Sequence, residues 1–465
     1  MILPPENVLQ NLSREELIAI LLQMAADMRR LEAEVQRLQA EVERLKKPPT
    51  TSQNSSQPPA RDWKSNSAGR KRYRKSGAKL GHAPAQRALV DNPNTVIEAR
   101  VSRCADCGAN LRFVKPTRVL RRQITELPEI TPVVLETQQH EVECPECHTV
   151  QRGVLPEGLE AQRQFGPRLE SAITFFHHEQ HLGFERLQQT LRDVFGVEVS
   201  EGGEVAVLER AGEAALPEAE AIGSRVRESA VIGSDETSVR VHGRNWWEWV
   251  FVSEAGEYHL ICPSRGHDVV AAFMGEAQAE VWVSDCWKPQ LNAPAQTHQL
   301  CLPHQIRNLQ GLIDKRPHLQ WAREMQALFR KAVHLEHRRE VLTRRGFKRQ
   351  VQLLEKRLDR LLARKLTGKA ALTLQERYRT HRQHLFVFLH RPDVPADNNA
   401  CERALRPSVI HRKVMGSFRS EWGPHAYAAL ATVLNTAKRK GENVFQKLVS
   451  LMGKPVLHYL NPSIA

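Results

Sequence analysis

Three acidic residues, far apart in the sequence, stand where a carboxylate is unexpected. Asp235 ends the apolar run that begins at Ala230, and Asp285 ends the run that begins at Val281. Glu402 lies in a polar stretch much later in the chain. Buried strands normally exclude aspartate, because desolvating an unpaired charge costs several kcal/mol. Two strand-terminal aspartates and a distant helical glutamate therefore suggest a cage for hard divalent cations, and in a basic protein this indicates chemistry on phosphodiesters.

The chemistry that fits three such acids is two-metal phosphoryl transfer, in which carboxylates hold two ions about 3.5–4 Å apart. One ion activates water or a 3′-hydroxyl, and the other stabilises the leaving oxygen. We therefore expect Asp235, Asp285 and Glu402 to be catalytic and to bind two Mg²⁺ ions, for which Mn²⁺ can substitute. Any one of these acids alone would more often be a turn or cap residue, as we expect for Asp397, the N-cap of the next helix.

The residues around Glu402 predict a helix face that binds both metal and phosphate. Asn399, Glu402 and Arg406 are spaced i, i+3, i+7 and share one face of a helix. Pro407 predicts that this helix is short. The alternative is an exposed helix with charge pairs. The residues expected to contact DNA here are Asn399, Arg403, Arg406, Arg412 and Lys413.

Four of the eight cysteines form two Cys-x-x-Cys pairs, Cys104/Cys107 and Cys144/Cys147. Two such pairs supply four thiolates for a tetrahedral zinc ion at about 2.3 Å, with no position left open for catalysis. A redox pair is disfavoured, because there are two pairs and no adjacent strand–helix–strand pattern. We therefore expect a structural zinc ribbon that contacts DNA, built on short strands at 95–101, 118–127 and 133–142.

The composition favours a polyanionic partner. The net charge is +14, from 67 basic and 53 acidic residues. No apolar run approaches the roughly 18–20 residues that span a bilayer, and the N-terminus does not resemble a signal peptide. No phosphate-binding Gly-x-x-x-x-Gly-Lys-Ser/Thr motif occurs. We therefore expect a cytoplasmic, nucleoid-associated protein with no membrane partner.

Upstream elements are expected to hold the DNA and pair the chains. Residues 17–45 repeat apolar side chains at alternating spacings of four and three, with Val at a and Leu at d positions, which favours a parallel two-stranded coiled coil. A homodimer or higher oligomer follows; the alternative is an amphipathic helix packed on its own chain. Residues 61–79 carry eight Lys and Arg against one acid, a basic arm suited to phosphates. Its expected DNA-binding residues are Arg70, Lys71 and Arg72.

The remaining pattern predicts a multidomain, mainly α protein with an α/β catalytic core. Helices at 165–179, 184–195 and 204–213 have the outline of a helix-turn-helix, although many helical bundles share it. A strand meander follows at 229–242, 245–253 and 257–263, then a helix at 267–275, the strand before Asp285, and a short strand at 298–302. Residues 305–390 are almost wholly helical. The expected segments are a coiled-coil helix (1–47), a basic linker (48–80), a zinc ribbon (81–153), a helical DNA-binding segment (154–225), a catalytic domain (226–415) with a helical insertion (305–395), and a C-terminal helical segment (416–465).

On these motifs the chain resembles the transposases of the insertion sequence 66 family, bacterial members of the DDE recombinases. The resemblance includes the heptads, the basic linker, the cysteine pairs, the run from Ser234 to Val241, and the run from Asp397 to Pro407. It implies an RNase H-like core with a helical insertion, and a catalytic triad of Asp235, Asp285 and Glu402. Cys301 and His304 match a Cys-x-x-His signature of the family; by chemistry alone they would be a buried cysteine and a structural histidine. After Asp285 the chain reads Cys-Trp-Lys-Pro, where the family usually has an aromatic- and glycine-bearing turn.

The function implied by the resemblance is that of a DNA transposase. Such an enzyme binds the terminal inverted repeats of its element, hydrolyses the phosphodiester at each 3′ end, and joins the freed 3′-hydroxyls to target DNA. Its partners are double-stranded DNA of the element ends and the target; accessory proteins of the same element are left open. Two rivals remain: a transposase-derived zinc-ribbon DNA-binding protein without catalysis, and an RNase H-like nuclease for junctions or RNA hybrids.

Overall fold

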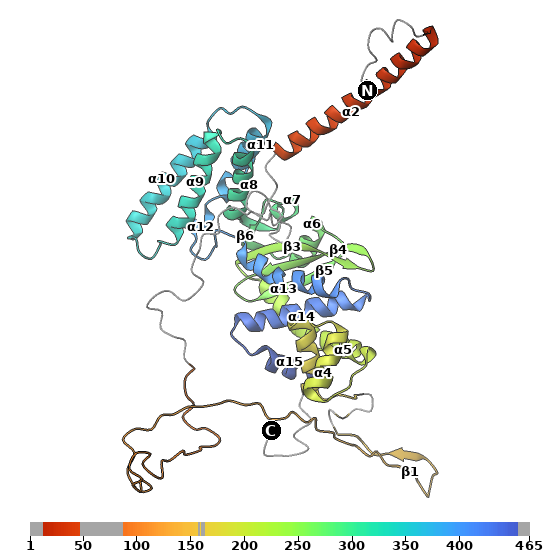
Figure 1. Cartoon of the computed structure of the whole chain (residues 1–465), viewed down its shortest axis with the longest axis vertical. Helices are drawn as coiled ribbons and strands as arrows, with labels where there is room; N and C mark the ends of the chain where they lie inside the picture. Colours follow the sequence, from red (N-terminus) through yellow and green to blue (C-terminus); the bar gives the residue numbers. More distant parts are fainter. Residues whose placement is uncertain (1–12, 47–86, 157–158, 160–162, 454–465) are drawn as a thin grey trace. The chain divides into compact units, whose positions relative to one another are not determined.

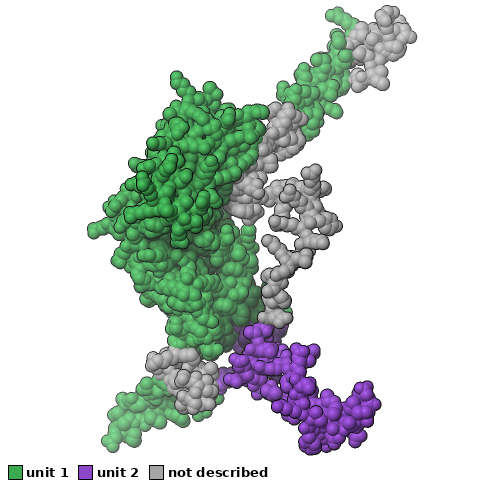
Figure 2. Space-filling view, turned by 90° about the vertical axis from the view of Figure 1, so that its left-hand side faces the viewer, with its two compact units in different colours: residues 1–63, 136–190, 198–465 green, residues 64–135, 191–197 purple. Residues whose placement is uncertain are grey.

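The structure, a computed structural model, describes residues 13–46, 87–156, 159 and 163–453. The chain divides into two compact units (Figure 2). One contains Met1–Trp63, Glu136–Thr190 and Glu198–Ala465, and the other Lys64–Leu135 and Leu191–Val197. The predicted basic linker, with Arg70, Lys71 and Arg72, lies outside the described residues.

The predicted N-terminal helix is confirmed as α2, Arg14–Lys46. None of the described residues covers its apolar seam: Leu21, Met28, Leu31 and Val35 are each more than half exposed. Apolar side chains in a heptad repeat need a partner helix to become buried. Pairing with a second copy therefore stays a prediction, now favoured over packing on the same chain.

Around the cysteine pairs the sequence predicts more strand than the structure contains. The strands expected at 95–101 and 118–127 are wrong, because the described residues from 87 to 135 hold only an isolated bridge, Arg103 to Asn110. Ile97 is 90% exposed and Ile124 is 94% exposed, so the apolar side chains of these runs have no face to pack against. The third expected strand survives only at its end, where β1 (Glu141–Glu143) pairs antiparallel with β2 (Val150–Arg152).

A five-stranded mixed sheet lies within the larger unit (Figure 1). Its strand order is β5-β4-β3-β6-β7. The predicted meander is confirmed as three antiparallel strands, and β6 and β7 run parallel to β3. His242 and Gly243, both with positive φ, make the two-residue turn between β3 and β4. The strands are β3 Val231–Val241, β4 Arg244–Val252, β5 Glu257–Cys262, β6 Ala279–Ser284 and β7 Ala295–Leu300.

Helices cover the sheet and close two large apolar cores. One core joins Ile232, Trp249 and Trp282 of the sheet to α5 (Glu201–Arg227) and three further helices. These are α6 (His267–Met274), α14 (Trp422–Arg439) and α15 (Val444–Met452). The other core joins Val281 and Val283 to the helical insertion.

The helical insertion between Asp285 and Glu402 is confirmed. It has its own aromatic interior, which includes Trp321, Phe329 and Tyr378. Its elements are α8 Leu302–Lys315, α9 Gln320–Glu336, α10 Arg344–Leu362, α11 Lys369–Thr380, a short 3₁₀ turn Arg382–His384, and α12 Val387–His390. Within the described residues, no helix is long and apolar enough to cross a membrane.

The helical segment before the sheet differs from its prediction mainly in the length of its third helix. Here α3 (Pro167–Thr174) continues into a π-helical turn, η2 (Phe175–Glu179), and α4 covers Phe184–Phe195, the predicted range. The third helix, α5, is far longer than 204–213 and packs along α14. A Cβ on Gly212 would lie 2.3 Å from the Cβ of Ala426, so glycine permits this close packing. The packed face of α5 is not available to DNA, and a DNA-binding role for the segment stays a prediction.

Candidate active site

The two aspartates lie side by side because of strand register. In the parallel pair of β3 and β6, Val231 is opposite Val281 and Gly233 is opposite Val283. Two residues further along, the same register aligns Asp235 with Asp285, which directly follows β6. Side chains alternate between the faces of a sheet, so both carboxylates belong to one face.

Helix α13, Asn399–Met415, brings Glu402 to this face. Cys401 packs in a small apolar cluster with Val250 and Val252 of β4, and Val250 pairs with Asp235. A Cβ on Gly233 would come 3.0 Å from the Cys401 sulfur, so glycine lets the helix approach the strand. The three predicted acids are thus brought together from three distant parts of the sequence. The prediction that Asp235 ends its strand is wrong, because β3 continues to Val241 through its pairing with β4; only Asp285 directly follows a strand.

Polar contacts set where α13 lies along the sheet. Asn398 Nδ2 donates to the Ser234 carbonyl at 2.7 Å, and the Ser408 hydroxyl donates to Glu248 at 2.7 Å. Arg412 donates to the Thr237 hydroxyl at 3.4 Å and to the Ser238 carbonyl. Arg412, predicted to contact DNA, therefore also anchors the helix that carries Glu402.

Two predictions about α13 need correction. Pro407 does not make the helix short, because the helix continues to Met415. Proline removes only the hydrogen bond to the Arg403 carbonyl, and the sheet contacts on both sides hold the helix together. Asp397 is not the N-cap; Asn398 holds that position, while Asp397 accepts the Asn399 backbone N–H at 3.0 Å and its side-chain amide at 2.6 Å.

The remaining predicted DNA-contacting residues of α13 divide by exposure. Arg403, Arg406 and Lys413 are exposed. Asn399 is half-buried and hydrogen-bonded to Asp397. The helix that carries Glu402 therefore exposes three cations along its length, two of them, Arg403 and Arg406, within about one turn of Glu402.

Cys301 and His304 now have a structural role that the sequence left open. Cys301 directly follows β7, and its backbone N–H donates to the Ser284 carbonyl at 2.9 Å, beside Asp285. Its buried sulfur accepts the backbone N–H of Asn398 at 3.3 Å and lies 3.1 Å from His304 Nδ1. Burial raises the pKa of Cys301 to about 12, so it stays a thiol. Cys301 thereby connects the second acid to the start of α13.

His304 and Arg307, on the first turns of α8, face the third acid. His304 Nε2 lies 3.7 Å from Glu402 Oε1, and Arg307 Nη2 lies 3.2 Å from the same oxygen. Burial and the charge of Arg307 lower the pKa of His304, against the opposite effect of Asp285 and Glu402. Arg307, which the sequence did not single out, is the principal cation on Glu402.

The altered turn after Asp285 still supports that residue. The Trp287 backbone N–H donates to Asp285 Oδ1 at 2.8 Å. The Arg265 guanidinium lies over the Trp287 ring at 4.3 Å and over the Trp247 ring at 4.4 Å. Arg265 in turn donates to Glu236 at 2.9 Å. The turn is thus built into a stack of side chains next to the acids.

Glu236 is a fourth carboxylate that sequence reasoning missed. Its side chain is only 4% exposed and is held by Arg265 and by Gln290, which also accepts the Ser234 hydroxyl at 3.1 Å. Its position directly after Asp235 in the sequence could have indicated a fourth carboxylate close to the acids. Strand alternation directs it away from the Asp235 face, toward Ser234 and Gln290.

Burial and mutual repulsion characterise the acidic site. Burial raises the pKa of Asp235 well above its ordinary value, and the charges of Glu236, Asp285 and Glu402 raise it further. Burial and Glu236 likewise raise the pKa of Asp285. Carboxylate oxygens are the donors that Mg²⁺ takes, and a divalent cation would relieve this repulsion. The donor chemistry therefore fits, although in the part of the chain that the structure describes no three His, Cys, Asp or Glu side chains are grouped to hold a metal ion.

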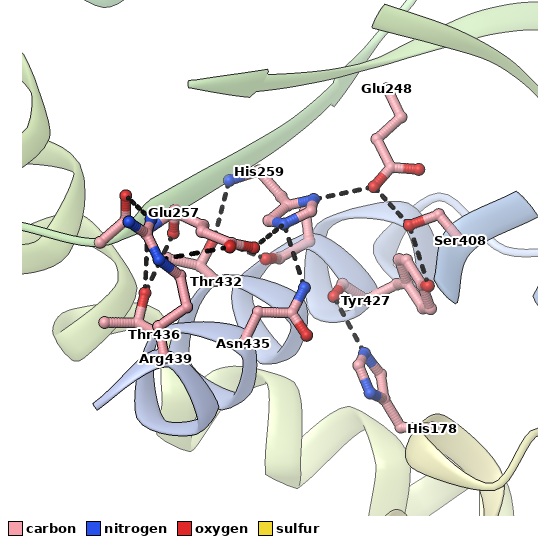
Figure 3. Close-up of polar contacts among 12 residues, drawn as sticks. His178, Glu248, Glu257, His259, Ser408, Tyr427, Thr432, Asn435, Thr436 and Arg439 are labelled. Carbon is pink, nitrogen blue, oxygen red and sulfur yellow. Dashed lines mark hydrogen bonds and ion pairs between the residues drawn. The ribbon is translucent and has the colours of Figure 1, made fainter. Parts of the chain in front are cut away.

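A buried charge network lies on the same sheet face, across β4 and β5 (Figure 3). His259 Nδ1 lies 2.9 Å from Glu248, and its Nε2 lies 3.8 Å from Glu257. Burial opposes the charged imidazole, but the hydrogen bonds and charges of both glutamates outweigh it and raise the pKa of His259 to about 9. Because Glu248 also accepts the Ser408 hydroxyl, the network helps to hold α13 on the sheet.

The two cysteine pairs form the same kind of turn. Cys104 N–H donates to the Ala109 carbonyl at 2.9 Å, and Cys144 N–H donates to the Thr149 carbonyl at 2.9 Å. The residue after each second cysteine, Gly108 or His148, has a positive φ. The backbone N–H of Cys107 lowers the pKa of Cys104, and the Thr149 hydroxyl lowers that of Cys147. Such turns favour the thiolates that zinc takes.

Comparison with known families gives two matches. A family model described as "Transposase IS66 family" matches residues 162–426, which include Asp235, Asp285 and Glu402. A second, described as "zinc-finger binding domain of transposase IS66", matches residues 102–148, which include both cysteine pairs. No protein among the curated sequences matches the chain.

Proposed function

The chain belongs to the insertion sequence 66 family of transposases, and on this premise we propose that it cuts and joins DNA at the ends of a bacterial insertion sequence. It binds the terminal inverted repeats, hydrolyses the phosphodiester at each 3′ end, and transfers the 3′-hydroxyls to target DNA. The observation that carries the proposal is the parallel register that aligns Asp285 with Asp235 on the face covered by α13.

The catalytic core is proposed to be RNase H-like. Three antiparallel strands followed by two parallel ones, in the order β5-β4-β3-β6-β7, support this assignment. So does the helical insertion, which lies between the second and third acids. A nuclease for junctions would have no use for the zinc-finger region that precedes the core.

Asp235, Asp285 and Glu402 are the proposed ligands of two Mg²⁺ ions, which activate the attacking oxygen and stabilise the leaving one. The other residues position these acids and the DNA. The turn at Trp287 orients Asp285, while Arg307 and His304 orient Glu402. Exposed cations on α13 bind phosphates of the strand: Arg403, Arg406 and Lys413.

The modules before the core are proposed to hold DNA and pair the chains. Cys104, Cys107, Cys144 and Cys147 bind one structural zinc ion, and this zinc ribbon contacts DNA. The arm with Arg70, Lys71 and Arg72 adds phosphate contacts. The exposed seam of α2 joins two copies. Location with the nucleoid follows from these DNA contacts.

The test is a cleavage assay with the full chain in Mg²⁺. We expect specific release of the 3′ end from a duplex that carries the element end, and little reaction on a four-way junction. Equal cleavage of both substrates would favour a structure-selective nuclease. Binding of the element end without cleavage would favour a non-catalytic DNA-binding protein.

Removing the zinc is expected to weaken DNA binding without unfolding the core. The variant Cys144→Ser with Cys147→Ser loses two of four thiolates, which a tetrahedral site does not tolerate. Metal analysis should show loss of the zinc ion, and gel-shift titration should show weaker binding of element-end DNA. Cys262→Ser, a half-buried cysteine outside the pairs, is the control. Retention of the full zinc content by the double variant would refute the four-cysteine site.

A further inference from the structure

A cavity of about 580 Å³ opens beside the C-terminal half of α13, away from the acids. Its walls come from α13, the loop 416–421, the start of α14, and the helical segment before the sheet. The volume lies in the range of roughly 300–1,000 Å³ that is usual for small-molecule sites. None of the roles described so far uses this cavity.

Flat rings line the interior. His411 packs against Tyr427 with ring centroids 4.5 Å apart and against Phe418 at 6.0 Å. His177 stacks on Phe184 at 4.9 Å and meets His411 edge-on at 5.7 Å. All five side chains line the cavity. Such walls suit another planar ring, because aromatic faces and edges pack favourably.

Two imidazoles of this wall, those of His177 and His411, are neutral. Burial, with repulsion from neighbouring histidines, lowers the pKa of His177 to about 4 and that of His411 to about 2. Neutral rings do not attract an anion into the interior, so the interior suits an uncharged ligand. Glu248 also lines the cavity, and its buried Oε2 has no hydrogen-bond partner among the described residues.

The rim has its positive charge on the side of the sheet. Arg412 and Arg419 line that side, while Glu185 and Glu201 line the helical side. Arg412 bonds Thr237, two residues beyond Asp235 on the same face of β3. Val239 lines the cavity four residues beyond Asp235, or about 13 Å at roughly 3.3 Å per residue. That is about four base steps along a DNA strand.

We propose that this cavity binds one unpaired nucleobase of the DNA strand whose phosphate is cleaved at Asp235, Asp285 and Glu402. The uncharged planar ring enters the aromatic interior, and the phosphate of its nucleotide lies against Arg412 and Arg419. The inference rests on the proposed function for its substrate, DNA. It goes beyond that function by assigning a second subsite, which recognises a base within about four nucleotides of the cleaved bond.

The experiment uses the full chain and a short duplex that bears the element end, with one mismatched base pair moved position by position from the cleaved 3′ end. At one position the mismatch should tighten DNA binding about tenfold, because binding then no longer requires free energy to break a base pair. A duplex with an abasic nucleotide at that position should bind about tenfold more weakly than the mismatched duplex, because the base that would stack in the cavity is missing.

Ser417→Trp, at an exposed residue of the cavity wall, fills the site and should remove both position-specific effects. Trp422→Ala, which removes a ring from the wall, should weaken both without blocking the site. Ser224→Trp, on the exposed side of α5, is the matched control and should preserve them. Melting temperatures of all three variants show whether the fold is kept.

Uniform affinity for mismatches at every position would overturn the proposal while leaving cleavage of the intact element end untouched. Position-specific effects that persist in Ser417→Trp would also overturn it, because the base would then bind elsewhere. A chain that fails to cleave the element end contradicts the proposed function instead, and a position-specific mismatch effect on binding would still support the base site.

Discussion

Replacing Asp285 by asparagine is expected to abolish Mg²⁺-dependent cleavage of the element end while DNA binding remains. The variant keeps the shape of the side chain and its contact with the Trp287 backbone N–H. It removes a negative charge that would bind a catalytic metal ion. Because that ion stabilises the transition state by several kcal/mol, the cleavage rate should fall by about three orders of magnitude or more. The measurement is single-turnover release of a labelled 3′ end, with a gel shift in parallel.

Stability separates this loss from unfolding. Burial and the charge of Glu236 raise the pKa of Asp285, so its ionised form destabilises the fold when no cation is bound. Without divalent metal, Asp285→Asn should therefore melt at the same temperature as the parent chain or higher. Asp359→Asn, at an exposed aspartate paired with Arg382, is the control and should cleave normally. Undiminished cleavage by Asp285→Asn would remove Asp285 from the proposed triad.

Replacing His259 by leucine is expected to cost about 3–5 kcal/mol of folding free energy. The histidine is fully buried between Glu248 and Glu257, so its loss leaves two buried carboxylates without their shared cation (Figure 3). Trp249 and Trp282 are fully buried in the adjacent core and report unfolding in urea by fluorescence. Since Glu248 also accepts Ser408 of α13, cleavage should fall even where the variant is still folded.

The same network predicts how stability depends on pH. The pKa of His259 is about 9 in the folded chain, against about 6.5 when unfolded. Its contribution is therefore fully present below pH about 6.5 and is lost as the pH rises through about 9, which amounts to about 3 kcal/mol. His259→Gln should lack this decline. His390→Gln, at an exposed histidine 3.0 Å from Glu355, should retain it, because surface pairs contribute little. An unchanged pH profile in His259→Gln would contradict a charged His259.

Several elements followed from local pattern alone. The local residue pattern predicted the meander of β3, β4 and β5, and apolar periodicity predicted α2, α4 and helices of the insertion. Cys-x-x-Cys spacing predicted two tight turns, which the structure contains at Cys104 and Cys144. These features depend on residues within a few positions of one another, so one sequence suffices to predict them.

Other features depended on partners far away in the chain. The expected strands at 95–101 and 118–127 did not form, because an apolar run becomes a strand only when another strand and a core accept it. Pro407 did not end α13, because contacts with β3 and β4 outweigh one lost backbone bond. Local propensity predicted both features incorrectly for the same reason: tertiary packing overrides it.

The sequence by itself determined which acids this protein has available, Asp235 on a strand, Asp285 after a strand and Glu402 on a helix, together with the family that the chain resembles. Only the tertiary structure decided their neighbours: the register that aligns the aspartates, Arg307 and His304 on Glu402, and the stack of Trp287 on Arg265. Residue types and local spacing can be taken directly from the sequence. Register and packing depend on contacts between residues tens to more than a hundred positions apart, so they exist only once the chain has folded.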